Sequence, residues 1–345
     1  MAEMKALNLH GVGDLRCEEV PMPKPEPGEV LLKIKAVGIC GSDIPRVFTK
    51  GTYHFPTIIG HEFAGDIVEA EDSNMVGCGA SVFPLIPCGK CAACREEQYA
   101  RCANYDYYGS RRDGAMAEYL AVRRENLCLY PKGVSYEEAA MSEPAAVALH
   151  AFRRSGIGPG DTLLIYGIGT IGMIIAQWAR TSAVESILLV DRTDDKAEFA
   201  KRLGFSLAVN IRSGNLKRMV AEVTEGRGAD VCIEGTGALE PLAECISMAK
   251  AGGTVVCMGN PVGNMGLSQD DYWKILRKEL TLVGTWNSSF GSRENDWLEA
   301  VKAMQDKKLN LEALITHRFS LAEYKEAFAL MHERRELYCK VMFVM

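Results

Sequence analysis

Two different patterns of apolar and polar residues follow one another along the chain. Up to about residue 130, short runs such as LLKIKAVGI (31–39) and FAGDIVEA (63–70) are separated by loops rich in Gly and Pro. Such runs predict short strands. From about residue 150, continuous apolar runs such as TLLIYG and SILLVD alternate with helical segments such as TIGMIIAQWARTSA. Strands that alternate with helices in this way are typical of a parallel sheet covered by helices on both faces.

After about residue 290 the pattern is helical and ends in one more short strand, YCKVMFVM. We therefore predict an α/β plus mainly β protein with two domains. Residues 1–150 and 290–345 are expected to form a β-rich domain, in which the last fifty or so residues pack back on the first part. Residues 151–289 are expected to form a Rossmann domain, a doubly wound parallel sheet. The length of 345 residues agrees with two domains of about 150 residues each.

Composition places the chain among globular proteins and excludes several classes of function. Hydrophobic residues make up 48% and charged residues 24%, which excludes wholesale disorder and long coiled coils. The net charge of −6 argues against nucleic-acid partners, which require a basic surface. No apolar run reaches the roughly 18 residues that span a bilayer. Because the N-terminus carries early charges and no apolar core, we expect no secretory signal and a cytoplasmic protein.

The segment LLIYGIGTIG (163–172) has the spacing of a dinucleotide-binding turn, G-x-G-x-x-G, between a strand and a helix. The first glycine permits the tight turn, the second lets the backbone approach a pyrophosphate, and the third allows close helix–strand packing. Nineteen residues after Gly172, Asp191 ends the next strand, where a carboxylate binds the ribose hydroxyls of NAD and repels the 2′-phosphate of NADP. The predicted cofactor-binding residues are Gly167, Gly169, Thr170, Ile171, Gly172, Asp191 and Arg192.

Two alternatives remain for this turn. It is also compatible with an ordinary strand–helix loop in which the aspartate caps a helix. Arg192 leaves the choice between NAD and NADP open, because an arginine beside the ribose can pair with the 2′-phosphate of NADP. We favour NAD.

Four of the twelve cysteines, at positions 88, 91, 94 and 102, fall within fifteen residues. In a reducing compartment such a cluster indicates a metal site rather than disulfides. Four thiolates at this spacing suit a closed, structural zinc site. Two alternatives remain for these cysteines. They are an iron–sulfur cluster and a chance clustering of buried thiols without a metal. We predict a structural zinc lobe over residues 86–104, held by Cys88, Cys91, Cys94 and Cys102.

A second set of metal-ligand residue types is more dispersed. It comprises Cys40 in GICGSD, His61 and Glu62 in IIGHEFAG, and Glu143 in MSEPAAVALH. A catalytic zinc takes about three protein ligands and keeps one position open. Taken separately, each residue also fits a structural role, as a core thiol, a buried imidazole or a helix-capping carboxylate. Their occurrence together before a dinucleotide fold favours a catalytic zinc site.

In these motifs and their order the chain resembles the zinc-dependent medium-chain dehydrogenases, the alcohol and polyol dehydrogenase superfamily. The matching segments are GHEFAG, the four-cysteine lobe, RDGAMAEY, SEPAAVALHA and GIGTIG. The resemblance covers essentially the whole chain and implies a GroES-like catalytic domain, two Zn²⁺ per chain, NAD, and a homodimer or homotetramer built through the edge of the α/β sheet. It also implies an enzyme that oxidises an alcohol by hydride transfer to the nicotinamide.

The resemblance implies a role for each residue of the catalytic set. Cys40, His61 and Glu143 would be the zinc ligands, with Glu62 as an alternative or exchanging ligand. Asp43 would orient His61, as metal-bound imidazoles require. Ser42 would hydrogen-bond the reacting hydroxyl and begin a proton path.

The chain departs from the family pattern at three places. Position 45 is Pro, where many members carry the histidine that ends the proton relay; His54 is a candidate substitute. The segment after GHEFAG is one residue short, and Ala80 stands where the family usually has Asp. These departures concern the relay and a local loop rather than the metal ligands.

Longer segments, including CGSDIPRVF, RCANYDYYGSRRDGAMAEY and KILRKELTLVGTW, resemble the family members that act on polyol phosphates. The implied substrate is a small polyol phosphate, oxidised at a secondary hydroxyl. Candidate residues for the phosphate are Arg46, Arg111 and Arg112, because arginine binds phosphate through charge-assisted hydrogen bonds. Lys278 and Trp286 are further candidates to flank the cleft.

Other substrates remain open at this stage. They are an unphosphorylated polyol of the sorbitol type and another secondary alcohol or threonine. A noncatalytic dinucleotide-binding protein is the alternative from another class.

Overall fold

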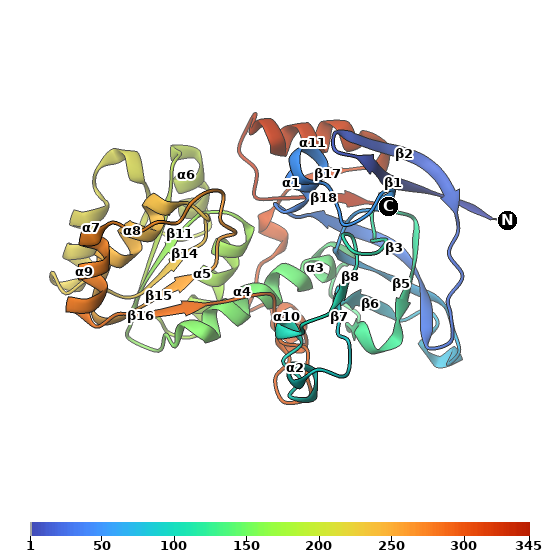
Figure 1. Cartoon of the computed structure of the whole chain (residues 1–345), viewed down its shortest axis with the longest axis horizontal. Helices are drawn as coiled ribbons and strands as arrows, with labels where there is room; N and C mark the ends of the chain where they lie inside the picture. Colours follow the sequence, from blue (N-terminus) through green and yellow to red (C-terminus); the bar gives the residue numbers. More distant parts are fainter. Residues whose placement is uncertain (1) are drawn as a thin grey trace. The chain divides into compact units, whose positions relative to one another are not determined.

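The computed structural model describes residues 2–345 and divides into two compact units. The β-rich unit contains the residues up to 146 together with residues 289–345. The α/β unit contains residues 147–288. Each unit carries its own hydrophobic core. The colours of Figure 1 let the reader follow the chain through the elements of each unit.

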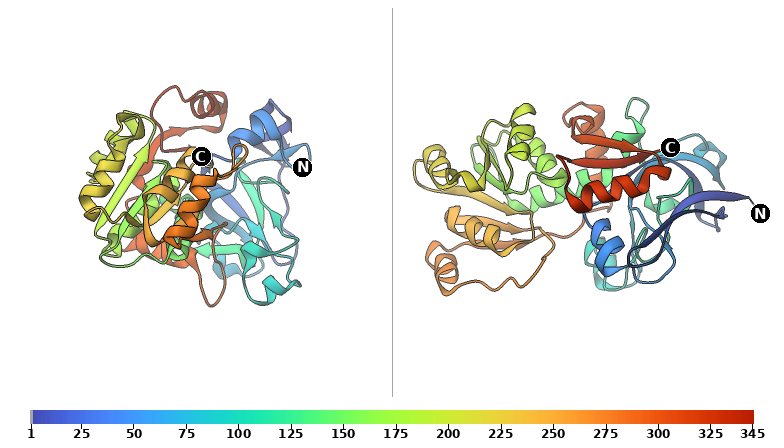
Figure 2. Two further views of the ribbon diagram at one scale, coloured as in Figure 1. Left: turned by 60° about the vertical axis from the view of Figure 1, so that its left-hand side comes forward. Right: turned by 90° about the horizontal axis from the view of Figure 1, so that it is seen from above.

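The α/β unit is built on one six-stranded parallel sheet with the order β13-β12-β11-β14-β15-β16. The strand β11 lies in the interior of the sheet, where its Leu164 pairs with Leu188 of β12 and Cys232 of β14. All five residues of β11 are buried, as expected for a strand with neighbours on both sides. Both views of Figure 2 show helices on the two faces of this sheet. The strands are β11 (Thr162–Tyr166), β12 (Ser186–Asp191), β13 (Ala208–Asn210), β14 (Ala229–Glu234), β15 (Ala249–Cys257) and β16 (Thr281–Gly284).

The helices of this unit follow the strands, as the alternating sequence pattern predicts. They are α5 (Thr170–Thr181), α6 (Asp194–Arg202), α7 (Leu216–Thr224), α8 (Leu239–Met248) and α9 (Gln269–Lys278). Lys278, a candidate for the cleft, instead ends α9 and donates to the carbonyl oxygens of Ser247 and Ala249, both at 2.7 Å. It therefore neutralises the free carbonyls at the end of α8.

The β-rich unit contains a seven-stranded sheet and two small sheets. The main path has the order β10-β6-β5-β3-β18-β17, with β9 also paired to β3. Its strands are β3 (Glu29–Ile39), β5 (Glu62–Ala70), β6 (Gly79–Val82), β9 (Tyr119–Arg123), β10 (Leu127–Leu129), β17 (Ile315–Phe319) and β18 (Lys340–Val344). The small sheets contain β1 (Glu3–Gly11), β2 (Asp14–Pro21) and β4 (Thr57–Ile58), and β7 (Leu85–Ile86) and β8 (Asp106–Tyr107).

Helices of the β-rich unit are short except near its ends. They are α1 (Asp43–Pro45), the π-helical turn η1 (Arg46–Lys50), α2 (Ala92–Arg95), α3 (Tyr136–Ala140), α10 (Asp296–Gln305) and α11 (Tyr324–Glu333). The longer helix α4 (Ser142–Ser155) contains the division between the two units. None of the helices in residues 2–345 combines the length and apolar character needed to cross a membrane.

The last strand of the chain pairs with the third. In Figure 1 the red β18 lies against the blue β3, and the two are antiparallel with Val341 opposite Ile39. Val341, Met342 and Phe343 of β18 are buried, and Val341 and Phe343 belong to the core of the β-rich unit. The C-terminal residues thus belong to the sheet that carries the first metal-ligand candidates.

The turn between β11 and α5 contains the three glycines of the G-x-G-x-x-G motif. Gly167 has φ +107°, a conformation that a residue with a side chain rarely adopts. A Cβ on Gly172 would lie 2.1 Å from the carbonyl oxygen of Gly167, whereas a Cβ on Gly169 would meet nothing within 4 Å. The third glycine is therefore required for packing, and the second leaves open space at the start of the helix.

We predict opposite stability effects for two alanine substitutions in this turn. Gly172→Ala should lower the free energy of unfolding by about 1–3 kcal/mol, because the methyl group overlaps a backbone oxygen. Gly169→Ala should change it by less than about 0.5 kcal/mol, because its φ of −99° suits alanine and the space is open. Chemical denaturation of the two variants measures both effects. Equal destabilisation by the two substitutions would contradict this account of the turn.

Candidate active site

The ends of two neighbouring strands bring the second set of ligand candidates together. Strand β3 ends at Ile39, so Cys40 follows directly, and β5 begins at Glu62 directly after His61. The strands are antiparallel, with Gly38 opposite Glu62. The end of one strand therefore lies beside the start of the other. A Cβ on Gly38 would overlap the carboxylate of Glu62, so glycine at this position makes room for that side chain.

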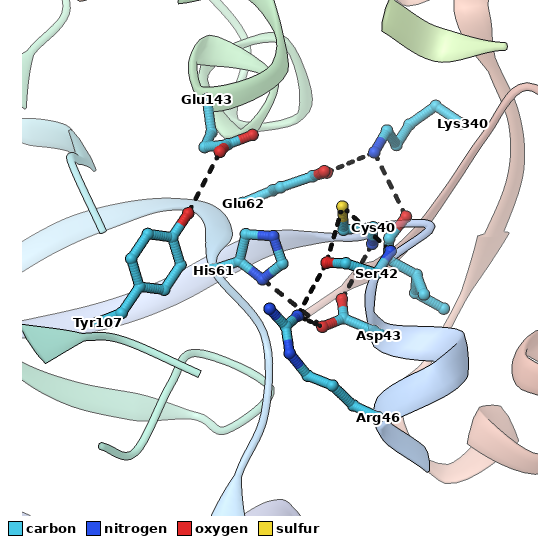
Figure 3. Close-up of polar contacts among 10 residues, drawn as sticks. Cys40, Ser42, Asp43, Arg46, His61, Glu62, Tyr107, Glu143 and Lys340 are labelled. Carbon is cyan, nitrogen blue, oxygen red and sulfur yellow. Dashed lines mark hydrogen bonds and ion pairs between the residues drawn. The ribbon is translucent and has the colours of Figure 1, made fainter. Parts of the chain in front are cut away.

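Three of the four predicted residues form a compact group. One ligand atom each of Cys40, His61 and Glu62 lie within 4.8 Å of one another. Glu143, in the first turn of α4, is not part of that group; its Oε1 accepts a hydrogen bond from the hydroxyl of Tyr107 at 3.5 Å. Figure 3 shows Glu143 facing this group from the helix, beside Glu62. Glu62 is therefore nearer to the ligand set than the resemblance implied, and Glu143 borders it.

A buried ion pair holds Glu62. The ammonium group of Lys340 in β18 bonds to Oε2 of Glu62 and donates to the carbonyl oxygen of Ile39 at 3.3 Å. Both charged side chains are 3% exposed. Burial alone would lower the pKa of Lys340, but the charge of Glu62 outweighs it and raises the pKa above its ordinary value. The lysine thus stays charged and competes with a metal for the Glu62 carboxylate.

Asp43 occupies the position predicted for the residue that orients His61. Its carboxylate is fully buried; Oδ2 accepts from the backbone N–H of Cys40 at 3.0 Å, and Oδ1 lies 3.5 Å from Nδ1 of His61. Burial raises the pKa of Asp43, but the charges and hydrogen bonds of His61 and Arg46 lower it to about 2. A carboxylate in this state fixes the imidazole and leaves its other nitrogen for a metal.

Ser42 and Arg46 complete the polar network around Cys40. The hydroxyl of Ser42 donates to Sγ of Cys40 at 3.3 Å. Nη1 of Arg46 donates to Oγ of Ser42 at 2.9 Å and to Oδ1 of Asp43 at 2.7 Å (Figure 3). Arg46, a candidate for the substrate phosphate, therefore bonds to two side chains of the site itself.

The donor set fits a zinc ion. Thiolate, imidazole and carboxylate are the groups that zinc binds in catalytic sites. Burial lowers the pKa of His61, but Asp43 and Cys40 outweigh it and raise that pKa well above the ordinary value. Burial and the neighbouring Glu62 raise the pKa of Glu143. A divalent cation beside Glu62 and Glu143 would relieve the repulsion between these two buried carboxyl groups.

The four cysteines of the predicted lobe also converge. Their Sγ atoms all lie within 4.8 Å of one another, and those of Cys91 and Cys94 are 3.5 Å apart. Backbone N–H groups of Ala103 and Cys94 lower the pKa of the Cys91 thiol, while burial raises that of Cys94. The lobe fits a structural zinc, as predicted from its spacing.

The cofactor residues of the α/β unit lie around the end of its central strands. Gly169 precedes α5, whose first residues are Thr170 and Ile171. Asp191 ends β12; its Oδ2 accepts from the backbone N–H of Ile168 at 2.8 Å. Arg192 is exposed directly after it. Asp191 thus touches the glycine turn, where it can meet the ribose of a dinucleotide.

The remaining phosphate candidates lie on a turn next to β8. The guanidinium of Arg111 is 4.3 Å from the ring centre of Tyr53 and 4.6 Å from that of Tyr105. Arg112 lies 3.7 Å from the carboxylate of Asp106 and over the ring of Tyr108. These positions leave Arg111 without a carboxylate partner among the described ion pairs.

His54 does not reach the hydroxyl of Ser42. Its ring nitrogens face the carbonyl oxygens of Pro56 and Arg111, each at 3.1 Å, and its Nδ1 also lies 3.1 Å from the hydroxyl of Thr57. The histidine therefore holds two loops together instead of serving the proton path considered for it.

Two residues of this site were not among the predicted ones. Tyr107 packs edge-on against His61, with ring centres 5.7 Å apart, and contacts Glu143. Lys340 pairs with Glu62, as described above. A signal existed for Lys340, since a lysine inside the apolar strand YCKVMFVM requires an anionic partner. No local pattern singles out Tyr107 among its aromatic neighbours.

Two family models match the chain. The alcohol dehydrogenase GroES-like domain matches residues 26–132, and the zinc-binding dehydrogenase model matches residues 170–306. Galactitol 1-phosphate 5-dehydrogenase of Escherichia coli (strain K12) is 33% identical over 94% of this chain and 95% of the relative. Sorbitol dehydrogenase of Halalkalibacterium halodurans is 32% identical over 94% and 95%. L-threonine 3-dehydrogenase of Pyrococcus horikoshii is 33% identical over 91% and 90%.

Solved structures with the same fold extend this comparison. Galactitol-1-phosphate dehydrogenase from Escherichia coli superposes with a TM-score of 0.92 at 32% identity, covering 99% of this chain and 100% of the other. A zinc-binding dehydrogenase from Sinorhizobium meliloti 1021 bound to NADP has a TM-score of 0.91 at 29% identity, with full coverage of both chains. An alcohol dehydrogenase from E. coli CFT073 complexed with NADH has a TM-score of 0.91 at 28% identity, also with full coverage.

The matched family models, the relatives and the solved structures agree with one another and with the fold. They confirm the predicted combination of a GroES-like domain and a Rossmann-type parallel sheet. The chain belongs to the zinc-dependent medium-chain alcohol and polyol dehydrogenases, a family of oxidoreductases.

Proposed function

We propose that this enzyme oxidises a secondary hydroxyl of a phosphorylated polyol with NAD, converting galactitol 1-phosphate to tagatose 6-phosphate. The observation that carries the proposal is the placement of Arg111. Its guanidinium stacks on Tyr105, whose ring is 6.3 Å from that of Tyr107, and Tyr107 contacts both His61 and Glu143. Two tyrosine rings therefore separate this cation from the group around Cys40. The phosphate of an extended polyol would lie beside the cation while its hydroxyl lies at the group around Cys40.

Arg111 suits a phosphate better than the other two candidates do. Arg46 is already paired with the buried Asp43, and Arg112 faces Asp106. The two tyrosine rings hold the guanidinium of Arg111 in place, and its Nη2 donates to the hydroxyl of Tyr53 at 3.3 Å. The other N–H groups lie in the plane of the guanidinium, where they would bind a ligand. A charge-assisted hydrogen bond to phosphate is worth about 1.5–3 kcal/mol, which is enough to favour a phosphorylated substrate.

The residues around Cys40 divide the work of the reaction. Cys40, His61 and a carboxylate of Glu62 or Glu143 would hold the zinc, which would supply Lewis-acid chemistry that lowers the pKa of the substrate hydroxyl. Asp43 keeps the imidazole in orientation, and Ser42 offers its hydroxyl to the reacting oxygen. A bound nicotinamide would accept the hydride of the carbinol carbon, and the hydroxyl proton would pass to solvent, so that the products would be a ketone and NADH.

We further propose NAD as the cofactor. Asp191 follows β12 in the position that meets the ribose, and its carboxylate favours a free 2′-hydroxyl over a 2′-phosphate. Arg192 is the group that would favour NADP, and the related structures contain either NADP or NADH. A comparison of the two cofactors in the assay below separates these possibilities.

We also propose a homodimer joined through strand β16. This strand pairs with β15 on one side, and among the described strands none pairs with its other side. Large apolar side chains stay exposed on β16 and the preceding helix, including Leu282 at 42%, Trp273 at 47% and Leu276 at 49%. An open apolar sheet edge of this kind is otherwise a site of uncontrolled association, and a second copy would cover it.

The substrate proposal predicts a selective effect of Arg111. The wild-type enzyme should oxidise galactitol 1-phosphate with NAD far better than galactitol or sorbitol, measured as NADH formation. Arg111→Ala should raise KM for galactitol 1-phosphate by roughly 10- to 100-fold, because it removes a charge-assisted phosphate contact. The same variant should leave the weak oxidation of galactitol unchanged.

Arg123→Ala is the matched control, since Arg123 is a surface arginine paired with Glu125 and should alter neither reaction. Comparable or better turnover of the free polyols by the wild type would assign the chain to the sorbitol-type enzymes. Oxidation of L-threonine in preference to every polyol would assign it to the threonine dehydrogenases.

The two ligand sets predict two zinc ions per chain, measured by elemental analysis of purified protein. Cys94→Ser should remove one ion and lower the temperature of unfolding, because closed zinc sites contribute directly to folding. Cys17→Ser, a change of a cysteine in β2, should keep both ions and the stability. A wild-type chain that binds zinc only in the four-cysteine lobe would support the noncatalytic alternative.

Free thiols in both sets suit the reducing cytoplasm, where we place the protein.

The proposed dimer predicts twice the chain mass in light scattering. Leu282→Glu should shift the protein towards the monomer, because it places a charge on the apolar edge. Val12→Glu changes a valine of similar exposure in the β-rich unit and should leave the mass unchanged. A monomeric wild type, or a Leu282→Glu variant that stays dimeric, would refute an interface at β16.

A further inference from the structure

We propose that Arg46 is a positioning residue of the dehydrogenase reaction: it fixes the hydroxyl of Ser42 toward the metal site, in the absence of a histidine at position 45. The inference deepens the proposed function by giving a role to a residue at the reacting centre. It concerns the oxidation of an alcohol in this site, whichever polyol is the substrate.

The contacts of Arg46 are fixed on both sides. Nη1 lies 2.7 Å from Oδ1 of Asp43 and 2.9 Å from Oγ of Ser42. Asp43 is itself immobile, because it is fully buried and bonded to the backbone of Cys40. The three side chains meet because they lie on one helical stretch, α1 followed by η1, at spacings of three and four residues.

The hydroxyl of Ser42 has a limited number of hydrogen bonds. It offers one donor and two acceptor lone pairs. Within residues 2–345, its side-chain partners are Nη1 of Arg46, which donates to it, and Sγ of Cys40, which accepts from it. An arginine cannot accept a hydrogen bond, so the hydrogen of Ser42 must point away from it. It points to Cys40 and thus toward the ligand atoms, where the reacting oxygen of the substrate binds.

The charge of Arg46 also acts on the reacting centre. Its guanidinium keeps its charge at all relevant pH values, so it cannot relay a proton as a histidine would. It instead polarises the Ser42 hydroxyl and makes it a stronger donor toward developing negative charge. Pro45 next to it has no side-chain donor or acceptor, which leaves this contact to Arg46.

A role in phosphate binding would use Arg46 differently. The carboxylate of Asp43, 2.7 Å away, compensates the positive charge of Arg46. Arg46 would therefore attract a phosphate less strongly than Arg111, which has no carboxylate partner among the described ion pairs. A phosphate ligand would also have to draw the guanidinium away from both Ser42 and a buried carboxylate. The two roles predict different kinetics, because one changes binding of phosphate and the other changes turnover of any alcohol.

The test is a double-mutant cycle of Arg46→Ala and Ser42→Ala, measured with galactitol 1-phosphate and with galactitol. Arg46→Ala should lower kcat by about 10- to 100-fold on both substrates, the size expected when one preorganised donor is lost. It should cause little further loss in the Ser42→Ala background, because Arg46 acts through that hydroxyl. Arg46→Lys should recover part of kcat, since a lysine keeps the charge but not the planar geometry.

Binding supplies a readout independent of turnover. The dissociation constant of galactitol 1-phosphate, measured by calorimetry with zinc-loaded protein, should be unchanged in Arg46→Ala and weakened in Arg111→Ala. Zinc content and unfolding temperature show whether each variant is intact. If Arg46→Ala does not fold, the cycle is run with Arg46→Lys, which retains a charged partner for Asp43.

Three results would overturn the proposal. The first is a loss of kcat in the double variant that equals the product of the losses in the two single variants. The second is a rise of KM in Arg46→Ala that is confined to the phosphorylated substrate. The third is weaker binding of galactitol 1-phosphate by Arg46→Ala. Failure of the substrate proposal is seen separately, in the preference of the wild-type enzyme. If the wild type prefers an unphosphorylated polyol, the cycle on that polyol still decides the role of Arg46.

Discussion

The carboxylate of Asp43 is the constraint on which the metal site depends. A fully buried anion is costly unless neighbouring groups stabilise its charge. Here one oxygen binds the backbone of Cys40, and the other faces His61 and Arg46. Because the carboxylate contacts each of these partners, it also fixes the backbone of Cys40, the imidazole and the guanidinium relative to one another. The low pKa of Asp43 and the high pKa of His61 are two consequences of the same arrangement.

A second buried pair ties the end of the chain to this centre. Lys340 follows Glu62 by 278 residues, yet it binds Glu62 because β18 pairs with β3 at the point where β3 and β5 meet. Removing either partner would leave an uncompensated charge, which costs several kcal/mol. The return of the chain after the α/β unit therefore does more than complete a sheet. It supplies the cation that sets where the Glu62 carboxylate lies.

The sequence predicts those parts of the site whose residues lie close together along the chain. The glycine turn, the four-cysteine lobe and the adjacent His61 and Glu62 depend on short spacings, which local geometry turns directly into structure. Partners across the fold do not follow from spacing. Tyr107 joins the site from the short strand β8, and Lys340 from the last strand. Lys278 is a further example. The segment KILRKELTLVGTW, in which it lies, does not indicate that Lys278 binds the carbonyl oxygens at the end of the neighbouring helix α8.

Substrate choice in this family must reside outside the metal ligands. Relatives named for galactitol 1-phosphate, sorbitol and L-threonine are 32–33% identical to this chain over at least 91% of it. All three are named as dehydrogenases, so the class of reaction is common to them while the named substrates differ. Discrimination then requires groups that meet the far part of the substrate. In this chain Tyr107 and Tyr105 connect His61 to the cationic Arg111 through edge-on ring contacts and a cation–π contact. Under the proposed function, these rings would set the distance between the reacting oxygen and the cation, and the spacing of hydroxyl and phosphate along the substrate would be the property that is recognised.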